Sequence, residues 1–372
     1  MKIKSNITPS FLAYIGALLI VIATGYFLHV DTYLFAKHKT ADPAAIVAEM
    51  EKNTDKTVFE SIRDSLSDII KQYGIEGALA VDAYAFTNNK MGIYQCHALT
   101  HLIGHESIVY YGKDYAAVAS NYSHFCELGY VHGAEAQVVL SGGDYQHELY
   151  KLCDQIKKKD PSATCFHGAG HAFMNQTLDV QTSLTLCDGL IDEQHTIDDV
   201  TPCYNAVFAE LTNLVGGRDG ETAIPYTNGP PLTIKEATPL EYCAKIGERY
   251  RIQCVFEFSG LGIGPASTPA DVEGKLRNCV GENFDEELES ACIKSVAAVG
   301  MQHLLAGTST VSVPSFILSL SDPLRNAYIL GAATEMKQYV VSGATRNWES
   351  FCGGFTKEAD ASYCKSIFAQ QG

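Results

Sequence analysis

The chain is short of basic residues, with 27 lysines and arginines against 43 acidic residues and a net charge of −16. No basic cluster interrupts this acidic balance. An acidic surface repels phosphate groups, so the composition argues against nucleic acid and anionic lipid headgroups as partners. Alternating strand patterns are also nearly absent. We therefore expect an all-α protein that does not bind nucleic acid.

Familiar catalytic motifs are missing as well. The chain has no G-x-S-x-G, no phosphate-binding glycine loop and no dinucleotide fingerprint. The segment HLIGHE (101–106) has its glutamate after the second histidine, so it is not the HExxH of metalloproteases. These absences leave open whether the chain is an enzyme.

One long apolar run, Phe11 to Val30, stands near the N-terminus and contains no Asp, Glu, Lys or Arg. A helix of this length spans about 30 Å, which is the thickness of the hydrocarbon layer. Lys2 and Lys4 precede it, which favours a cytoplasmic N-terminus. We expect an uncleaved signal anchor, the alternative being a cleaved signal peptide and secretion.

This placement divides the chain into four segments. Residues 1–10 form a short cytoplasmic N-terminus, 11–30 a transmembrane helix and 31–55 a juxtamembrane linker or helix. Residues 56–372 form an extracytoplasmic domain, located in a periplasm, in a lumen or at a cell surface.

The 12 cysteines follow a regular spacing that suits an oxidising compartment. From residue 153 onward they form short-range couples. The second members, at 165, 203, 254 and 292, recur near 38 residues, and the next follows at 364 after a double step. Such a period is typical of stacked repeats. The five predicted disulfides are Cys153–Cys165, Cys187–Cys203, Cys243–Cys254, Cys279–Cys292 and Cys352–Cys364.

Each couple has the same context. A first helix ends near the first cysteine, a polar connection follows, and the second cysteine opens a second helix; Thr201-Pro202 is one such helix start. The segment from Pro323 to Tyr339 lacks cysteine and reads as a unit without a disulfide. The expected fold is an array of disulfide-linked helical hairpins, an α-solenoid or toroid, preceded by the transmembrane helix.

Cys96 and Cys126 lie outside this rule, because neither has a partner just upstream. They are expected to pair with each other and so to join two neighbouring units. The alternative is a pair of free thiolates beside the histidines.

Eight of the 12 histidines fall between residues 97 and 171. Aligned on their opening cysteines, three helices carry histidines or a glutamate at spacings of three and four, which place side chains on one helix face. If these helices line the inner side of the array, the side chains converge. The predicted metal ligands, all within the histidine-rich stretch 96–175, are His97, His101, His132, Glu135, His167 and His171.

Imidazole-rich ligation suits zinc, copper or iron. His105 and Glu106 are expected to orient a ligand ring, and Glu106 or Glu135 is the candidate general base if the ion is catalytic. The interior glycines of these helices predict close helix contact or room for a bound group. The sequence thus predicts transition-metal binding, for handling the ion or for metal-assisted chemistry.

Two alternatives stay open. The histidines form a hydrogen-bonded polar core of a non-catalytic scaffold for a protein or peptide, or two of them hold a haem. Units after Cys203 have Ala209, Gly260 and Ala298 where the earlier ones have His132 and His171, and Glu210 falls off the aligned face. These later units therefore read as scaffold.

Overall fold

The structure is a computed structural model. It describes residues 38–112, 126, 128–159, 164–216, 239–264, 266–281, 284–305, 312–341 and 348–369. The predicted membrane anchor at 11–30 lies outside these ranges. Within them, no helix is both long and apolar enough to cross a bilayer.

Every regular element in the described ranges is a helix, as the sequence predicts. In chain order the helices are α2 (Pro43–Met50), α3 (Val58–Thr87), α4 (Ile93–Tyr111), α6 (Gly129–Leu140), α7 (Tyr145–Lys159), α8 (His167–Thr177), α9 (Val180–Asp188), α10 (Ile197–Gly216), α11 (Pro239–Lys245), α12 (Glu248–Ser259), α13 (Pro269–Gly281), α14 (Glu286–Leu305), α15 (Ser315–Leu318), α16 (Asp322–Val341), α17 (Trp348–Gly353) and α18 (Glu358–Ala369).

Helix α3 shows how the sequence produces a helix. Thr57 and Glu60 form a capping box, in which each side chain bonds the other residue's backbone N–H. The apolar side chains that follow at helical spacing, such as Ile62, Leu66 and Ile69, are buried, and Gly74, with φ of 74°, kinks the helix. The helix thus begins at a local signal and is held by the core.

The 12 cysteines form six disulfides, and these include all five predicted couples. The sixth disulfide joins Cys96 of α4 to Cys126, two residues before the N-cap of α6. No free cysteine remains, so the free-thiolate alternative is wrong. Each predicted couple links one helix to the next along the chain, beginning with α7 and α8.

The predicted helix starts need correction. Only α8 begins directly behind its cysteine; α10, α12, α14 and α18 each begin one to two turns before it. Pro202 therefore lies inside α10, whose first turn carries Asp198 and Asp199. Acidic side chains in that turn interact favourably with the helix dipole, and this start signal precedes the cysteine.

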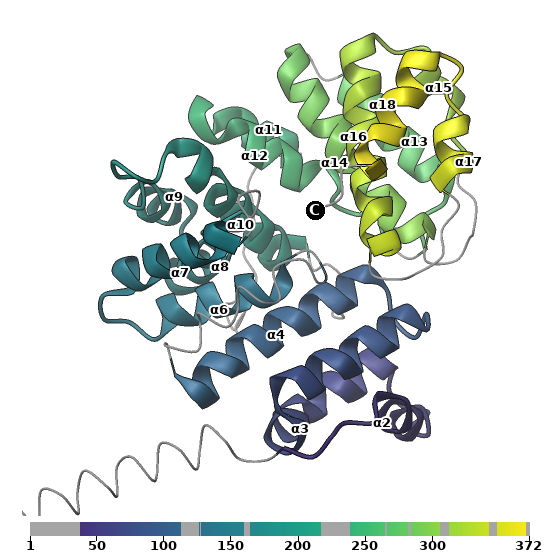
Figure 1. The fold of residues 1–372 in the computed structure, drawn as a ribbon. Helices are drawn as coiled ribbons and strands as arrows, with labels where there is room; N and C mark the ends of the chain where they lie inside the picture. The colour runs from purple at the N-terminus through teal and green to yellow at the C-terminus, as the bar shows by residue number, and fades with distance from the viewer. Residues whose placement is uncertain are drawn as a thin grey trace, which may run out of the picture.

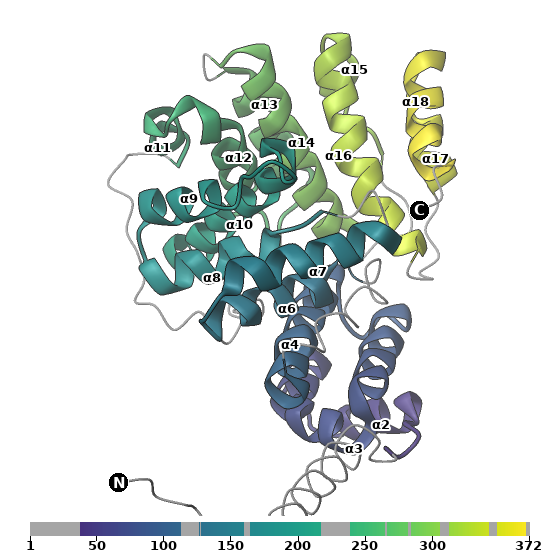
Figure 2. The ribbon, with the colours of Figure 1, turned by 60° about the vertical axis from the view of Figure 1, so that its left-hand side comes forward.

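The second helix of each pair packs against the corresponding helix of the next pair. Contacts run from α4 to α6, α8, α10, α12, α14, α16 and α18, each helix touching the next. Figures 1 and 2 show these helices following one another along a curved path. Helices far apart in sequence therefore face a common interior.

The segment without cysteine has an ion pair instead. Arg325 of α16 is 2% exposed, and its Nε atom donates to Asp360 of α18 at 2.6 Å. The same guanidinium donates to Asp322 and to the backbone carbonyl of Leu320. A buried charge network thus joins α16 to the last helix.

Candidate metal centre

Five imidazoles lie together at the inner side of α4, α6 and α8. Around the cluster, ring centroids are 4.6 Å apart for His97–His101, 5.5 Å for His101–His171, 4.9 Å for His171–His167, 4.3 Å for His167–His132 and 5.6 Å for His132–His97. Residues from three helices and 75 positions of sequence thus form one closed group. We call these five residues the histidine cluster.

Glycines bring the three helices close enough for this. A Cβ atom on Gly133 of α6 would stand 1.9 Å from the carbonyl oxygen of His101, and one on Gly168 of α8 would stand 1.9 Å from that of His132. No side chain fits at either place, so backbone packs directly on backbone. The histidines next to these contacts are thereby pressed toward one another.

Two pairs within the cluster have the same internal geometry. The Nε2 atoms of His97 and His101 are 3.1 Å apart, and so are those of His167 and His171. Both pairs are spaced four residues apart on one helix, so each shares a helix face. Each pair therefore offers two nitrogens toward a common point.

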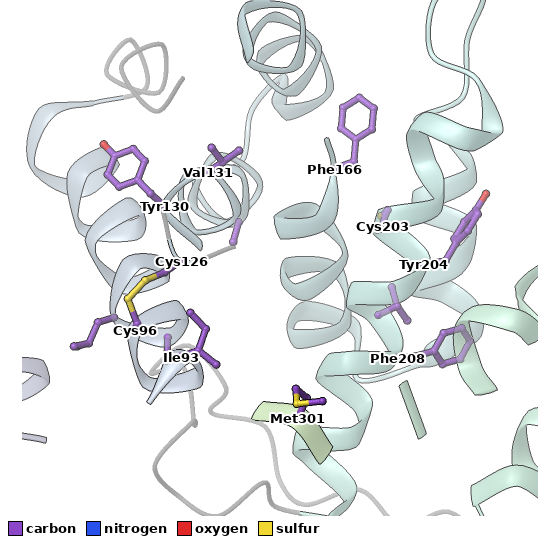
Figure 3. Close-up of a cluster of buried hydrophobic side chains, with 14 of the residues drawn as sticks. Ile93, Cys96, Cys126, Tyr130, Val131, Phe166, Cys203, Tyr204, Phe208 and Met301 are labelled. Carbon is purple, nitrogen blue, oxygen red and sulfur yellow. A yellow bond between two sulfur atoms is a disulfide. The ribbon is translucent and has the colours of Figure 1, made fainter. Parts of the chain in front are cut away.

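The other side of the His97 ring is fixed by backbone. Its Nδ1 atom lies 2.8 Å from the carbonyl oxygen of Cys126. A carbonyl only accepts, so Nδ1 carries the proton and Nε2 carries a lone pair. The Cys96–Cys126 disulfide, drawn in Figure 3 beside Ile93 and Tyr130, holds that carbonyl against α4.

The ring of His171 is fixed by a buried carboxylate. Its Nδ1 atom donates to Oε2 of Glu210 on α10 at 3.0 Å, and Glu210 is fully buried. Metal-binding histidines characteristically donate their second N–H in this way. The cysteine spacing places Glu210 off the aligned face, and the one signal for it in the sequence is its position seven residues after Cys203, on the next helix.

The ring of His167 faces that of His171 on the same helix. The Nε2 atoms of the two rings are 3.1 Å apart. Burial lowers the pKa of His167, and the backbone of Pro202, on α10, acts in the opposite direction. The two nitrogens lie close enough together to bind one cation.

His132 differs from the other four. Both of its ring nitrogens are buried without a hydrogen-bond partner, and the side chain is 5% exposed. Leaving a buried polar group unpaired costs about 1–3 kcal/mol. Its ring stands 5.2 Å from His101 and 4.3 Å from His167, centroid to centroid, so it contacts both pairs.

Protonation of these ring nitrogens is unfavourable in the folded chain. Burial lowers the pKa of His101, His132 and His167 well below its ordinary value, and the neighbouring imidazoles lower it further. The rings are therefore neutral near pH 7, which is the form that binds metal. Among the described residues, His97, His101 and His132 offer ligand atoms that all lie within 4.8 Å of one another.

The cluster opens on a cavity of about 380 Å³. Helices α4, α6 and α8 form one side of it, which we call the histidine wall. Helices α10, α12, α14 and α16 form the other side, the opposite wall. The opposite wall includes Ala209, Ala298, Glu257, Lys294 and Glu335.

The structure places the predicted carboxylates elsewhere. Glu135 is 1% exposed, and its two oxygens accept from the backbone N–H groups of Phe166 and Gly168, at 2.9 and 2.8 Å. Burial raises the pKa of this carboxyl to about 7, against the lowering effect of those two donors. Glu135 thus caps α8 and does not line the cavity.

His105 and Glu106 do not join the cluster either. They lie farther along α4, half-buried, with Nδ1 of His105 3.7 Å from Oε1 of Glu106, and neither lines the cavity. Orienting contacts of the kind predicted for them are made by Glu210 to His171 and by the backbone carbonyl of Cys126 to His97. Of the six predicted ligands, the five histidines come together and Glu135 does not.

No protein-family model, curated protein or solved structure shows a significant match to this chain. The chemistry of the centre therefore rests on its own residues.

Proposed function

We propose that this chain binds a transition metal through the histidine cluster. The observation that carries the proposal is the convergence of five imidazoles, in which the Nε2 atoms of each helix pair are 3.1 Å apart. A metal ion can accept a lone pair from each nitrogen of such a pair. The unpartnered nitrogens of His132 support the same conclusion.

Zinc, copper and iron are the ions that this ligand set suits, because it consists of imidazoles without thiolate or carboxylate. With metal–nitrogen bonds of about 2.0–2.1 Å, two imidazoles on one tetrahedral ion have ring centroids about 5 Å apart. The observed separations of 4.3 to 5.6 Å bracket that value. A haem is less well supported, since its two axial rings lie on opposite faces of a porphyrin.

The wider setting is part of the proposal. We infer an array of helical hairpins, anchored in a membrane by residues 11–30 and exposed to an oxidising, extracytoplasmic compartment. Six disulfides and the apolar N-terminal run support this placement. The rival function, a metal-free scaffold for a protein or peptide, would use the same array.

Metal analysis of the full-length chain, produced in an oxidising compartment without chelators, tests the proposal. We expect at least one equivalent of zinc, copper or iron per chain in the purified protein, and loss of that metal in the double variant His97→Ala/His171→Ala, which removes one histidine from each pair. His147→Ala is the matched control, because His147 is exposed on α7 and does not line the cavity.

The result that contradicts the proposal is a folded protein that neither contains these metals nor takes them up from solution. Circular dichroism confirms folding of each variant. An absorption spectrum separates haem from a bare ion, because haem absorbs strongly in the visible range whatever its axial ligands.

A further inference from the structure

We propose that the centre holds two metal ions, joined by the imidazole of His132. The inference rests on the proposed metal-binding function and adds its stoichiometry and its bridging residue. His132 comes from α6, the middle helix of the histidine wall, and α4 and α8 on either side of it each contribute one pair of histidines.

The two pairs have the same internal spacing and lie on different helices, α4 and α8. Each offers two Nε2 atoms 3.1 Å apart, and each is anchored through an Nδ1 atom to the backbone or to Glu210. The pair on α4 and His132 already form a three-nitrogen group. The pair on α8 has His132 at 4.3 Å from the ring of His167.

A single bound ion would leave one polar atom of the site unpaired. An imidazole gives one ion one nitrogen, so the second nitrogen of His132 would stay buried without a partner. That cost of about 1–3 kcal/mol disappears when a second ion takes the second nitrogen. The complete lack of partners around both atoms of this ring is what a bridge requires.

The proton balance is simple. Neutral His132 carries one N–H proton, and binding of the second ion replaces that proton with a metal–nitrogen bond. The proton leaves to solvent, and the ring remains as an imidazolate between two dications. With metal–nitrogen bonds of about 2.0–2.1 Å, such a bridge separates the ions by about 6 Å.

Each ion then has three nitrogen ligands, two from its own pair and one from His132. Three protein ligands leave the fourth tetrahedral position for water or a small exogenous ligand. The cavity of about 380 Å³ lies against the cluster and provides the space for that ligand. Asn213, Glu257 and Lys294 line it as polar neighbours.

Loading the metal-free chain with copper(II) chloride tests the bridge. We expect two copper ions per chain, and an electron paramagnetic resonance signal that accounts for much less than the total copper, because an imidazolate couples the two spins. His132→Gln is expected to restore the full signal of isolated copper(II) at whatever stoichiometry remains. His147→Ala should behave as wild type.

Each outcome has a distinct meaning. No bound copper overturns the proposed function and this inference together. One ion per chain overturns only the inference, as do two ions whose signal accounts for all the copper. Since the wild-type stoichiometry and spin count already decide the question, a poorly folding His132→Gln variant would not obscure it.

Discussion

The two walls of the cavity are both built from stacked helices, but they present different side chains to the cavity. On the histidine wall, the position six residues after the cysteine of α6 and α8 is His132 and His171; in α10 and α14, on the opposite wall, it is Ala209 and Ala298. All four residues line the same cavity. In four of the five aligned helices the position therefore faces the cavity; in the fifth, α12, it is Gly260, which does not line it.

Close backbone contact is common to both walls. A Cβ on Gly133 would be 1.9 Å from a carbonyl oxygen of α4, and one on Gly331 of α16 would be 2.2 Å from a carbonyl oxygen of α14. Glycine thus allows close backbone contact at four of the helix contacts, α4–α6, α6–α8, α8–α10 and α14–α16. The histidines are a separate addition, confined to three helices.

The opposite wall can be destabilised by a substitution that leaves the histidines unchanged. Replacing Arg325 by methionine leaves Asp360 buried without its partner, and losses of this kind cost about 3–5 kcal/mol. Urea denaturation measures the loss, and metal content should not change. The double variant Arg325→Met/Asp360→Leu is expected to recover most of the stability; a single variant as stable as wild type would contradict the role of the ion pair.

Breaking the histidine wall should lower stability and metal affinity together. In Gly133→Ala the new Cβ overlaps the carbonyl of His101, so α4 and α6 must separate. We expect a loss of about 1–3 kcal/mol in the free energy of unfolding and weaker metal binding.

Gly274→Ala is the matched control for Gly133→Ala. This glycine is exposed within α13, and its Cβ would meet nothing within 4 Å. Alanine there is expected to stabilise the helix by up to about 1 kcal/mol and to leave metal binding unchanged. Equal effects of the two substitutions would contradict the close-contact argument.

Glu210 joins the two walls, because it lies on α10 of the opposite wall and accepts a hydrogen bond from His171 of the histidine wall. The substitution Glu210→Gln keeps the shape and removes the charge. We expect metal affinity to fall about 10–100-fold, as measured by competition with a chromophoric chelator. Glu248→Gln, on the exposed start of α12, is the control; unchanged affinity in Glu210→Gln would show that the carboxylate plays no part.

Acid should destabilise the histidine wall of the metal-free chain. The pKa values of His101, His132 and His167 are lowered by burial, so as pH falls through about 6.5 the unfolded chain takes up protons that the folded chain refuses. The free energy of unfolding therefore decreases below that pH. Glu135, whose pKa is raised to about 7, acts in the opposite direction and reduces the slope.

Urea denaturation at pH 7.5 and 5.5 measures this effect. His132→Gln should flatten the dependence, because it removes one of the three groups. Stability that stays constant or rises on acidification would contradict the assignment of neutral buried imidazoles.

Much of the fold was readable from the sequence because its signals are local. The apolar spacing of α3, the couples such as Cys153–Cys165 and the shared face of His97 and His101 all lie within a few helical turns. The predicted helix starts were wrong because acidic residues, as in the first turn of α10, begin the helix before its cysteine. Local pairing was predictable, while helix boundaries were not.

The carboxylates that interact with the site were harder to predict from the sequence. Glu135 matches the ligand spacing, yet the N–H groups of Phe166 and Gly168 take its oxygens. The cysteine spacing places Glu210 off the aligned face, yet its side chain accepts a hydrogen bond from His171 on another helix. Spacing reports which residues share a face of one helix, and it carries no information about what the next helix presents to that face.

The sequence by itself determined an all-α chain, its five local disulfides and the histidine pairs, because each depends on residues close together in the chain. Only the tertiary structure decided that the pairs meet around His132 and that Glu210 replaces Glu106 as the orienting carboxylate. The physical reason is the close approach of helix backbones at Gly133 and Gly168. That contact sets which rings face one another, and it exists only once the helices have packed.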